Sequence, residues 1–195
     1  MGREWISPLG NLYASTIIRL RPDDPPAPTL AFVAAVAVHR TLAKLSPFDL
    51  FQIKWPNDIL SNKGAKLCGM LLERVNDAVV LGVGINLRHY PQGLDRPVTS
   101  ISALGIAAPA PQVLVEILAQ ELVQALSTWR MHGHGAIQAD WLSRAHAIGT
   151  MLKGQLPDGE IIEGLFDGLN NDGALMLRLA DGSIRVIHAA DVFLV

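Results

Sequence analysis

The sequence predicts an α+β fold, in which a β-sheet packs on helices, followed by a small second domain of short strands. Runs of β-forming residues alternate with long apolar or amphipathic helical patterns over most of the chain. After Gly149 this alternation stops, and short strand-like runs are separated by turns that contain glycine, a pattern typical of a small barrel. The length of 195 residues accommodates both parts, and we place the domains at residues 1–147 and 148–195.

Each element has its own local signal. Strands are predicted where β-branched and other apolar residues cluster between turn residues, with a tight turn at Asn76-Asp77 joining two of them. Helices are predicted where apolar residues recur on one face or, in the first helix, almost all round, with Thr29 as the expected cap of that helix. The predicted strands are residues 11–20, 51–55, 69–73, 78–87, 161–166, 174–179 and 184–189. The predicted helices are residues 29–45, 111–131 and 136–146, the last two separated by a break at residues 133–135.

Composition restricts the class of protein. Half of the residues are hydrophobic and 17% are charged, so the chain can bury a substantial core. A formal net charge of -2 argues against a general nucleic-acid or membrane-surface binder. No apolar run reaches the ~20 residues that a membrane helix needs, and the single cysteine, Cys68, has no partner for an internal disulfide. We therefore expect a cytoplasmic protein.

The pentapeptide Lys54-Trp55-Pro56-Asn57-Asp58 is the strongest local indication of a functional site. A strand meets a proline here, and polar groups of different chemistry are gathered at its end. Lys54 could neutralise a carboxylate or a phosphate in a cleft, or it could be a surface lysine beside a buried Trp55. Asn57 and Asp58 could bind a ligand, or they could form an ordinary turn. Taken together, the five residues favour a site for an anionic ligand.

Glycines alternate within the strand-like run at residues 82–86. This run is not a dinucleotide-binding loop, because Leu87 stands where the third glycine would be and no helix follows. The glycines could let a flat ligand lie against the backbone, or they could allow close packing of another element. Asn86, at the end of the strand, could bind a ribose or a phosphate, or stabilise its own turn.

Other polar residues carry weaker signals. Lys66 precedes a strand, a position most often held by a solvated edge lysine. Cys68 is interpreted as a small buried hydrophobic residue, because no histidine lies near it in the sequence. His132 and His134 lack further ligands at metal-binding spacing, so we interpret them as part of a loop that ends a helix and expect no metal held by side chains alone.

Four motifs, in this order and spacing, resemble the catalytic region of the biotin protein ligases, and the resemblance extends over essentially the whole chain. The motifs are Gly2-Arg3-Glu4-Trp5, Lys54-Trp55-Pro56-Asn57-Asp58, Lys66-Leu67-Cys68-Gly69 and Gly84-Ile85-Asn86. The resemblance implies a mixed β-sheet backed by helices and a small C-terminal SH3-like β-barrel. It also implies a two-step reaction: biotin and ATP form biotinyl-5′-AMP, and a lysine of a biotin acceptor protein, such as the carboxyl carrier protein of acetyl-CoA carboxylase, then receives the biotin.

The resemblance also implies roles for individual residues. Lys54 would be the catalytic cation between the biotin carboxylate and the α-phosphate, and Gly69 and Gly84 would lie against biotin. Four residues would contact the nucleotide, of which the first would also be catalytic: Arg3, Trp5, Asn57 and Asn86. ATP would bring Mg²⁺. A homodimer is a possible assembly, and no DNA-binding domain precedes the motifs, so neither nucleic-acid binding nor repression is expected.

The chain departs from the family pattern at its start. The family's loop runs Gly-Arg-Gly-Arg-x-Gly-Arg-x-Trp, of which only Gly2-Arg3-Glu4-Trp5 is present, and the biotin-binding Ser/Thr-Thr-Asn turn upstream is missing. We expect Met1 to be a truncated or misassigned start. A basic loop that closes over the adenylate supplies charge and excludes water, so its loss is expected to slow the first step by orders of magnitude.

Two alternatives to the biotin ligase remain open. A lipoate–protein ligase shares the fold, although the Lys-Trp-Pro-Asn-Asp motif and the added barrel favour biotin. A non-catalytic remnant that binds a nucleotide or an acceptor protein is supported by the incomplete loop.

Overall fold

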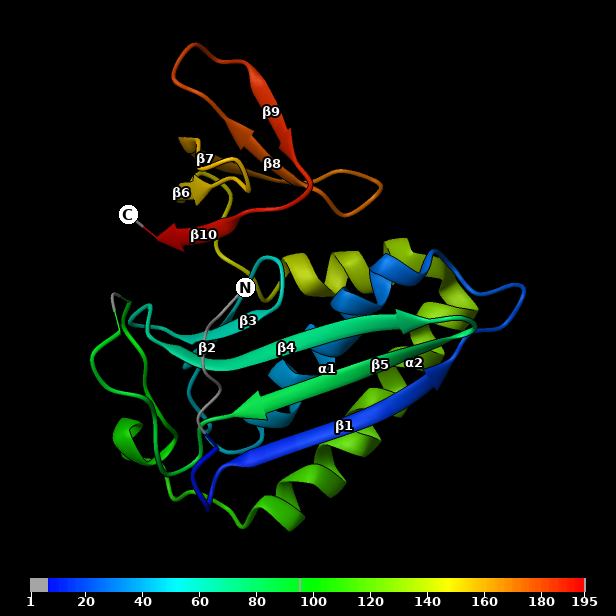
Figure 1. Cartoon of the computed structure of the whole chain (residues 1–195), viewed down its shortest axis with the longest axis vertical. Helices are drawn as coiled ribbons and strands as arrows, with labels where there is room; N and C mark the ends of the chain where they lie inside the picture. Colours follow the sequence, from blue (N-terminus) through cyan, green and yellow to red (C-terminus); the bar gives the residue numbers. More distant parts are fainter. Residues whose placement is uncertain (1–6, 95, 195) are drawn as a thin grey trace.

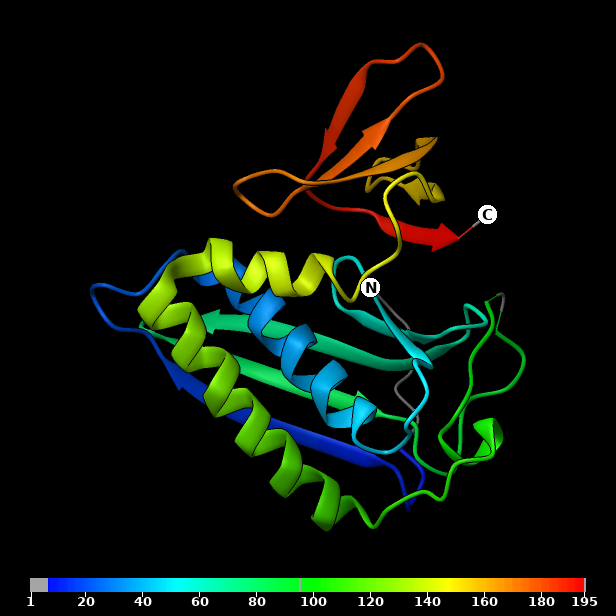
Figure 2. The same cartoon turned by 180° about the vertical axis from the view of Figure 1, so that it is seen from behind.

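The computed structural model describes residues 7–94 and 96–194 and confirms the predicted α+β fold (Figure 1). A larger sheet is covered on one face by two helices, and a smaller sheet lies beyond one end of it (Figures 1 and 2). The strands of the larger sheet are β1 (Leu12–Arg19), β2 (Phe51–Lys54), β3 (Asp58–Ser61), β4 (Lys66–Val75) and β5 (Ala78–Ile85). The helices are α1 (Leu30–Ala43) and α2 (Pro111–Leu142), with short 3-10 turns at Ala27–Thr29 and Ser102–Leu104. The strands of the smaller sheet are β6 (Met151–Gln155), β7 (Ile161–Leu169), β8 (Leu175–Arg178), β9 (Ile184–Ile187) and β10 (Asp191–Leu194).

The larger sheet has the strand order β1-β5-β4-β3-β2. All pairings between its named strands are antiparallel, and among the described residues the parallel pairings are two isolated bridges, Ile53 with Ala145 and Lys66 with Val98. The first of these bridges lays the segment after α2 along the outer edge of β2. The turn predicted at Asn76-Asp77 is present, and Asn76 adopts a positive φ of 54°, which an asparagine in a tight turn tolerates.

Helix α1 is buried over most of its surface, as its apolar sequence predicts. Leu30, Val33 and Val36 are fully buried between the sheet and α2. The expected cap is wrong in its detail, because Thr29 itself has helical φ and ψ and makes no capping bond to the helix. Its hydroxyl instead donates to the Pro26 carbonyl (2.6 Å) and accepts from the indole of Trp129 (2.7 Å), so Thr29 joins α1 to α2.

The break predicted near residue 133 is present, but it is smaller than expected. Gly133 leaves the helical region (φ 79°, ψ 174°), and the chain resumes its helix at His134. The two predicted helices therefore form one bent element, α2, and His134 lies inside it rather than in a loop. The element ends at Leu142, so His146, expected within a helix, lies in the connection to the smaller sheet, where its own side chain is buried.

The sequence patterns missed three strands, β3, β6 and β10. All three have only four or five residues, and β3 directly follows the polar residues that were interpreted as a turn or a binding site. The smaller sheet has the antiparallel order β10-β6-β7-β8-β9. Since no pairing between β9 and β10 is described for residues 151–194, closure into a barrel stays a prediction.

Within the described ranges, no helix is both long enough and apolar enough to span a membrane.

Candidate functional site

One row of paired residues crosses all five strands of the larger sheet. Hydrogen-bonding register places Tyr13 opposite Gly84, Gly84 opposite Gly69, Gly69 opposite Asp58, and Asp58 opposite Lys54. Residues directly opposite each other in antiparallel strands project from the same face. The row therefore places a strip of bare backbone, made by two facing glycines, between a tyrosine and a lysine–aspartate pair.

This row lies on the face that the helices leave uncovered. Next to Gly69 in β4, Met70 is 4% exposed toward the helices, whereas Leu71, on the same side as Gly69, is 59% exposed. Figure 1 shows this face toward the viewer, with both helices behind the sheet. The two glycines have no side chains that would keep a flat ligand away from the backbone, but Gly69 is half-buried and Gly84 is buried, so the ligand interpretation of the alternating glycines stays a prediction.

A β-bulge brings Lys66 onto the same face as Gly69. Strict alternation along β4 would put these two residues on opposite faces, because they are three positions apart. The pairing with β3 slips by one residue, however: Ile59 pairs with Cys68, but the next residue, Leu60, pairs with Lys66. One extra residue in a strand reverses the alternation beyond it, so the Lys66 side chain projects beside Gly69.

Asp58 binds both lysines of the site. Its Oδ2 atom lies 3.1 Å from the Lys54 ammonium, and its Oδ1 atom forms an ion pair with Lys66. The carboxylate is 5% exposed, so water does little to weaken either interaction. Two ammonium groups and one carboxylate leave the cluster with a net charge of about +1, which favours an anion on the neighbouring glycines.

Lys54 is the less accessible of the two lysines. It is 8% exposed, and its ammonium also donates to the backbone carbonyl of Val192 (2.7 Å) in β10. Burial lowers the pKa of Lys54, and the Asp58 carboxylate acts in the opposite sense. The alternative of a surface lysine is thus wrong, and Trp55 beside it is buried as expected.

Lys66 reaches the ligand face directly. Its Nζ atom lies 3.2 Å from the point where a Cβ atom on Gly69 would be, so the ammonium covers part of the glycine strip. The interpretation of Lys66 as a solvated edge lysine is wrong, because β4 is an interior strand and the ammonium is held by Asp58. The sequence patterns gave Lys66 too little weight as a candidate for the site. Its position three residues before Gly69 was the available signal, but regular strand alternation places residues three apart on opposite faces, and only the bulge brings them together.

The two asparagines of the predicted site are hydrogen-bonded to nearby backbone. The Asn57 amide donates to the Met70 carbonyl (2.6 Å) and so ties the β2–β3 turn to β4. The Asn86 amide donates to the Thr99 carbonyl (3.0 Å), which fixes the segment that runs beside Lys66. Both residues therefore stabilise the backbone beside Gly69 and Gly84. A contact with a nucleotide would have to use the side-chain oxygen or the second amide hydrogen of each asparagine.

Asn11 is a further structural residue at this end of the sheet. Its side-chain oxygen accepts hydrogen bonds from three consecutive backbone N–H groups, those of Leu87, Arg88 and His89, each at 3.0 Å. This single side chain thereby shapes the loop that follows Asn86. The sequence prediction placed Asn11 at the start of the strand at residues 11–20 and gave it no role of its own.

Three other predicted features have separate outcomes. Cys68 is buried on the helix side, and burial raises the pKa of its thiol, which confirms its interpretation as a buried apolar residue. Arg3 and Trp5 lie outside the described residues. Across residues 7–94 and 96–194, no group of three or more His, Cys, Asp or Glu side chains could hold a metal ion.

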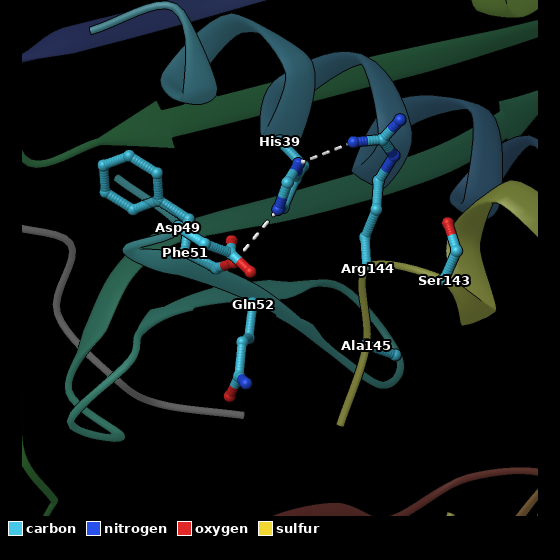
Figure 3. A pocket seen from close by; sticks show the side chains of 7 residues that line it. All are labelled: His39, Asp49, Phe51, Gln52, Ser143, Arg144 and Ala145. Carbon is cyan, nitrogen blue, oxygen red and sulfur yellow. Dashed lines mark hydrogen bonds between the residues drawn. The ribbon is translucent and has the colours of Figure 1, made fainter. Parts of the chain in front are cut away.

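A separate polar pocket of about 200 Å³ lies at the outer edge of β2, away from the glycine strip (Figure 3). Its lining includes His39 of α1, whose Nε2 atom is 3.0 Å from the Phe51 carbonyl, and Arg144, whose guanidinium binds Asp140. The backbone N–H of Ile53 donates to the Arg144 carbonyl nearby (2.8 Å). These polar groups satisfy one another, so the pocket is explained as part of the junction between α1, β2 and the end of α2.

Comparison with known proteins places both parts of the chain. The family model described as "Biotin/lipoate A/B protein ligase family" matches residues 1–88, and the one described as "Biotin protein ligase C terminal domain" matches residues 148–195. The biotin–acetyl-CoA-carboxylase ligase of Paracoccus denitrificans is 34% identical over 98% of this chain and 83% of its own length. The Mycobacterium tuberculosis protein of the same name is 34% identical over 84% of this chain and 61% of its own length.

Solved structures agree with these relatives. The biotin protein ligase of Aquifex aeolicus in complex with biotin and ATP superimposes with a TM-score of 0.84 at 22% identity, covering all of this chain and 83% of its own. The Leishmania major biotin protein ligase in complex with biotinyl-5-AMP has a TM-score of 0.65 at 26% identity, covering 97% and 83% of the two chains. At 22% identity, the Aquifex aeolicus structure supports the fold alone. The Leishmania major structure combines a similar fold with a sequence identity of 26%.

Proposed function

This chain belongs to the biotin protein ligase family, and we propose that the glycine strip beside Lys66 is the place where it activates biotin with ATP. The protein is accordingly a ligase that forms a C–N bond, with biotin and ATP as substrates and a carboxylase as acceptor. The observation that carries the proposed site is the pairing of Gly69 with Gly84 next to a cluster of net positive charge.

The first step joins two anions, and the site supplies what that step requires. An oxygen of the biotin carboxylate attacks the α-phosphorus of ATP, the bond to the β-phosphate oxygen breaks, and pyrophosphate leaves. A fixed cation reduces the repulsion between the carboxylate and the phosphate and holds them in contact. The flat backbone at Gly69 and Gly84 would support the biotin rings, so that the carboxylate end lies toward the lysines.

Both lysines are proposed to serve this step, in different ways. The more accessible ammonium of Lys66, over Gly69, is proposed as a second group that contacts the carboxylate and the α-phosphate. Lys54, which the motif alone indicated for that contact, has its ammonium between Asp58 and the Val192 carbonyl. We propose that Lys54, held in place by these two partners, is the catalytic cation that the motif indicates, and that it contacts the biotin carboxylate and the α-phosphate together with Lys66.

The nucleotide is proposed to lie across the same end of the sheet. Asn57 and Asn86 frame the strip there, and the resemblance assigns Arg3 and Trp5 to the phosphate and the adenine. The described residues offer no carboxylate cluster for Mg²⁺, so we propose that the ion is held chiefly by the phosphates of ATP. The ion would offset phosphate charge when bound.

In the second step, the acceptor's lysine amine attacks the acyl carbon of biotinyl-5′-AMP, AMP leaves, and the nitrogen loses a proton. We propose that the acceptor is the biotin carrier domain of the carboxylase and that catalysis takes place in the cytoplasm. A homodimer, and the absence of nucleic-acid binding, remain proposals of the same kind.

Biotin-dependent exchange of labelled pyrophosphate into ATP tests the first step, and transfer of labelled biotin to a carrier domain tests the second. We expect both activities in the unaltered chain, with a slow first step because the phosphate-contacting loop is incomplete, and a further fall in exchange of about 10²-fold or more in Lys66→Ala, because one of the two cations of the site is lost. Lys63→Ala is the matched control, since Lys63 is exposed in the adjacent β3–β4 turn. Equal exchange rates in the two variants would remove Lys66 from the mechanism.

Lipoate is the second candidate substrate, because the family model that matches residues 1–88 includes lipoate ligases. Exchange measured with biotin and with lipoate at equal concentrations separates the two. Exchange with lipoate alone would replace the proposed substrate while leaving the site in place.

A further inference from the structure

A third basic side chain lies beside the two lysines of the site. Where β5 ends, the segment at residues 96–99 takes its place alongside β4, because Val98 forms a parallel bridge with Lys66. The backbone N–H of Lys66 donates to the Pro97 carbonyl (2.9 Å) in the same segment. Figures 1 and 2 show the loop after β5 returning to the end of the sheet where β4 begins. Lys66 is therefore flanked by β3 on one side and by the segment that carries Arg96 on the other.

The charge of Arg96 acts on the other lysine of the site as well. Burial lowers the pKa of the Lys54 ammonium, and the Asp58 carboxylate opposes that shift. The positive charges of Lys66 and Arg96 lower this pKa further. Arg96 is half-buried, and its side chain makes no hydrogen bond or ion pair with another residue in the ranges 7–94 and 96–194. The donors of its guanidinium are therefore available to a ligand.

These four side chains hold an excess of positive charge when no ligand is bound. The three cations are Lys54, Lys66 and Arg96, and the one carboxylate is that of Asp58, so the group carries three positive charges against one negative charge, about +2 in total. Like charges in a partly buried place repel one another more strongly than they do in water. The arrangement costs stability in the folded chain, and an anion with several charges would relieve it.

We propose that Arg96 binds the β- and γ-phosphates of ATP and stabilises the pyrophosphate that leaves in the first step. Lys54 and Lys66 are the groups proposed to contact the biotin carboxylate and the α-phosphate, and Arg96 extends the same cationic surface past Lys66. The inference rests on the proposed function for the identity of the ligand, because it takes the anion to be the phosphate chain of ATP.

The chemistry of the first step gives Arg96 its role. When the bond between the α-phosphorus and the bridging oxygen breaks, its electron pair stays on the oxygen of the β-phosphate, and negative charge increases on the departing pyrophosphate. A guanidinium can donate two parallel N–H groups to two phosphate oxygens, whereas an ammonium acts as a point charge. In the second step AMP leaves and no pyrophosphate is present. Arg96 should therefore matter in the first step and much less in the second.

Binding of inorganic pyrophosphate in the presence of Mg²⁺ tests the contact without any catalysis. By calorimetry, we expect Arg96→Gln to weaken this binding about tenfold or more, because charge-assisted hydrogen bonds are lost, and Arg96→Lys to retain part of it. Arg74→Gln is the matched control, since it removes the same charge from an exposed arginine at the other end of β4. Equal affinities in Arg96→Gln and Arg74→Gln would overturn the proposal, as would the absence of pyrophosphate binding by the unaltered chain.

The two half-reactions test the role of Arg96 in catalysis. We expect Arg96→Gln to slow biotin-dependent pyrophosphate exchange about tenfold or more and to raise the KM for pyrophosphate, because a group that stabilises the leaving anion is lost. Transfer of biotin from preformed biotinyl-5′-AMP to a carrier domain should stay within about twofold of the unaltered rate. The thermal unfolding temperature should not change, since no described residue binds the guanidinium. A variant that is slowed equally in both half-reactions would show a structural role for Arg96 and contradict the inference.

Failure of the inference and failure of the proposed function give different results. An unaltered chain that binds pyrophosphate through Arg96 but shows no biotin-dependent exchange would contradict the ligase activity and keep the phosphate contact. An active chain in which Arg96→Gln leaves both pyrophosphate binding and exchange unchanged would contradict the inference alone.

Discussion

Glycine at position 69 matters because of the side chain beside it. An added Cβ atom would lie 3.2 Å from the Lys66 Nζ atom and 3.3 Å from its Cε atom, which is tighter than ordinary packing. Lys66 must therefore move if position 69 carries a methyl group. The same methyl group would project from the backbone surface proposed to support biotin and would displace the ligand. The flexible lysine can give way, so the effect should fall on the site more than on the fold.

We predict that Gly69→Ala lowers biotin-dependent pyrophosphate exchange by about tenfold or more, because a 1 Å misplacement of a reacting group costs of order 10²-fold. Gly82→Ala is the control, since its Cβ atom would meet only ordinary contacts beginning at 3.8 Å, and Gly82 lies in the neighbouring strand β5, two residues from Gly84. Thermal unfolding of both variants should stay close to that of the unaltered chain. Equal exchange by the two variants would show that the strip at Gly69 carries no ligand.

His146 gives the protein a dependence on pH. It is buried in the connection between the two sheets, and within the described structure its Nε2 atom has no hydrogen-bond partner. Burial, followed by the positive charge of Lys54, lowers the pKa of His146 to about 4. The folded protein thus favours the neutral imidazole, and burial lowers the pKa of His39 in the same direction.

We predict that stability is lost as the pH falls from 6.5 toward 4. In this range the unfolded chain binds a proton on His146 more readily than the folded chain does, which costs about 2 kcal/mol of unfolding free energy by pH 5. Denaturant unfolding at pH 7 and pH 5 measures the loss, and His146→Gln should show a smaller one. The same loss in His146→Gln would assign the pH dependence to other groups.

At the scale of elements, Gly133 determines the course of α2. Its φ of 79° and ψ of 174° lie in a region that is essentially restricted to glycine, and the bend lets the second part of the helix follow the edge of the larger sheet toward the C-terminal domain. Gly135, two residues later, is helical and has open space around it. The backbone at position 133 therefore requires glycine, whereas the backbone at position 135 would accept another residue.

We predict that Gly133→Ala destabilises the protein by about 1–3 kcal/mol, because alanine cannot adopt that backbone conformation without strain. Gly135→Ala should instead stabilise it by about 0.5–1 kcal/mol, since alanine favours a helix more than glycine does. Chemical denaturation measures both changes. A stabilising Gly133→Ala would mean that the helix runs straight through this position in solution.

The β3–β4 pair shows what element-scale prediction from the sequence missed. The strand signal at residues 69–73 was correct, but β4 begins at Lys66, and the bulge at its start reverses the face of the first residue. A period-two pattern has no means of showing an extra residue, because the slip exists only relative to the partner strand. The role of Lys66 was underrated for this reason.

At the scale of the whole molecule, the junction between the two sheets depends on Gly173. Its φ of 82° requires glycine, and its closeness to Phe32 leaves no room for a side chain. Gly182 in the β8–β9 turn has a similar φ of 84° but nothing within 4 Å of its Cβ position. Comparing the two separates the strain of a positive φ from the packing between the domains.

We predict that Gly182→Ala costs about 1–2 kcal/mol through backbone strain alone. Gly173→Ala should cost about 1–3 kcal/mol more, because the added methyl group overlaps Phe32 and forces the C-terminal domain away from α1. Thermal unfolding measures the difference, and proteolysis of residues 143–150 should become faster only in Gly173→Ala. Equal losses in both variants would show that the junction accommodates the methyl group.

The sequence by itself determined the α+β class, the largely buried α1, the break near Gly133 and the family, because these depend on local periodicity, glycine positions and ordered motifs. It also indicated that the Lys54 motif and the glycines of β5 belong to a site. Only the tertiary structure decided that Gly84, Gly69 and Asp58 form one row, that a bulge turns Lys66 onto it, and that Lys54 faces Val192. Register, bulges and contacts between distant segments depend on which strands pair, and no local pattern contains that information.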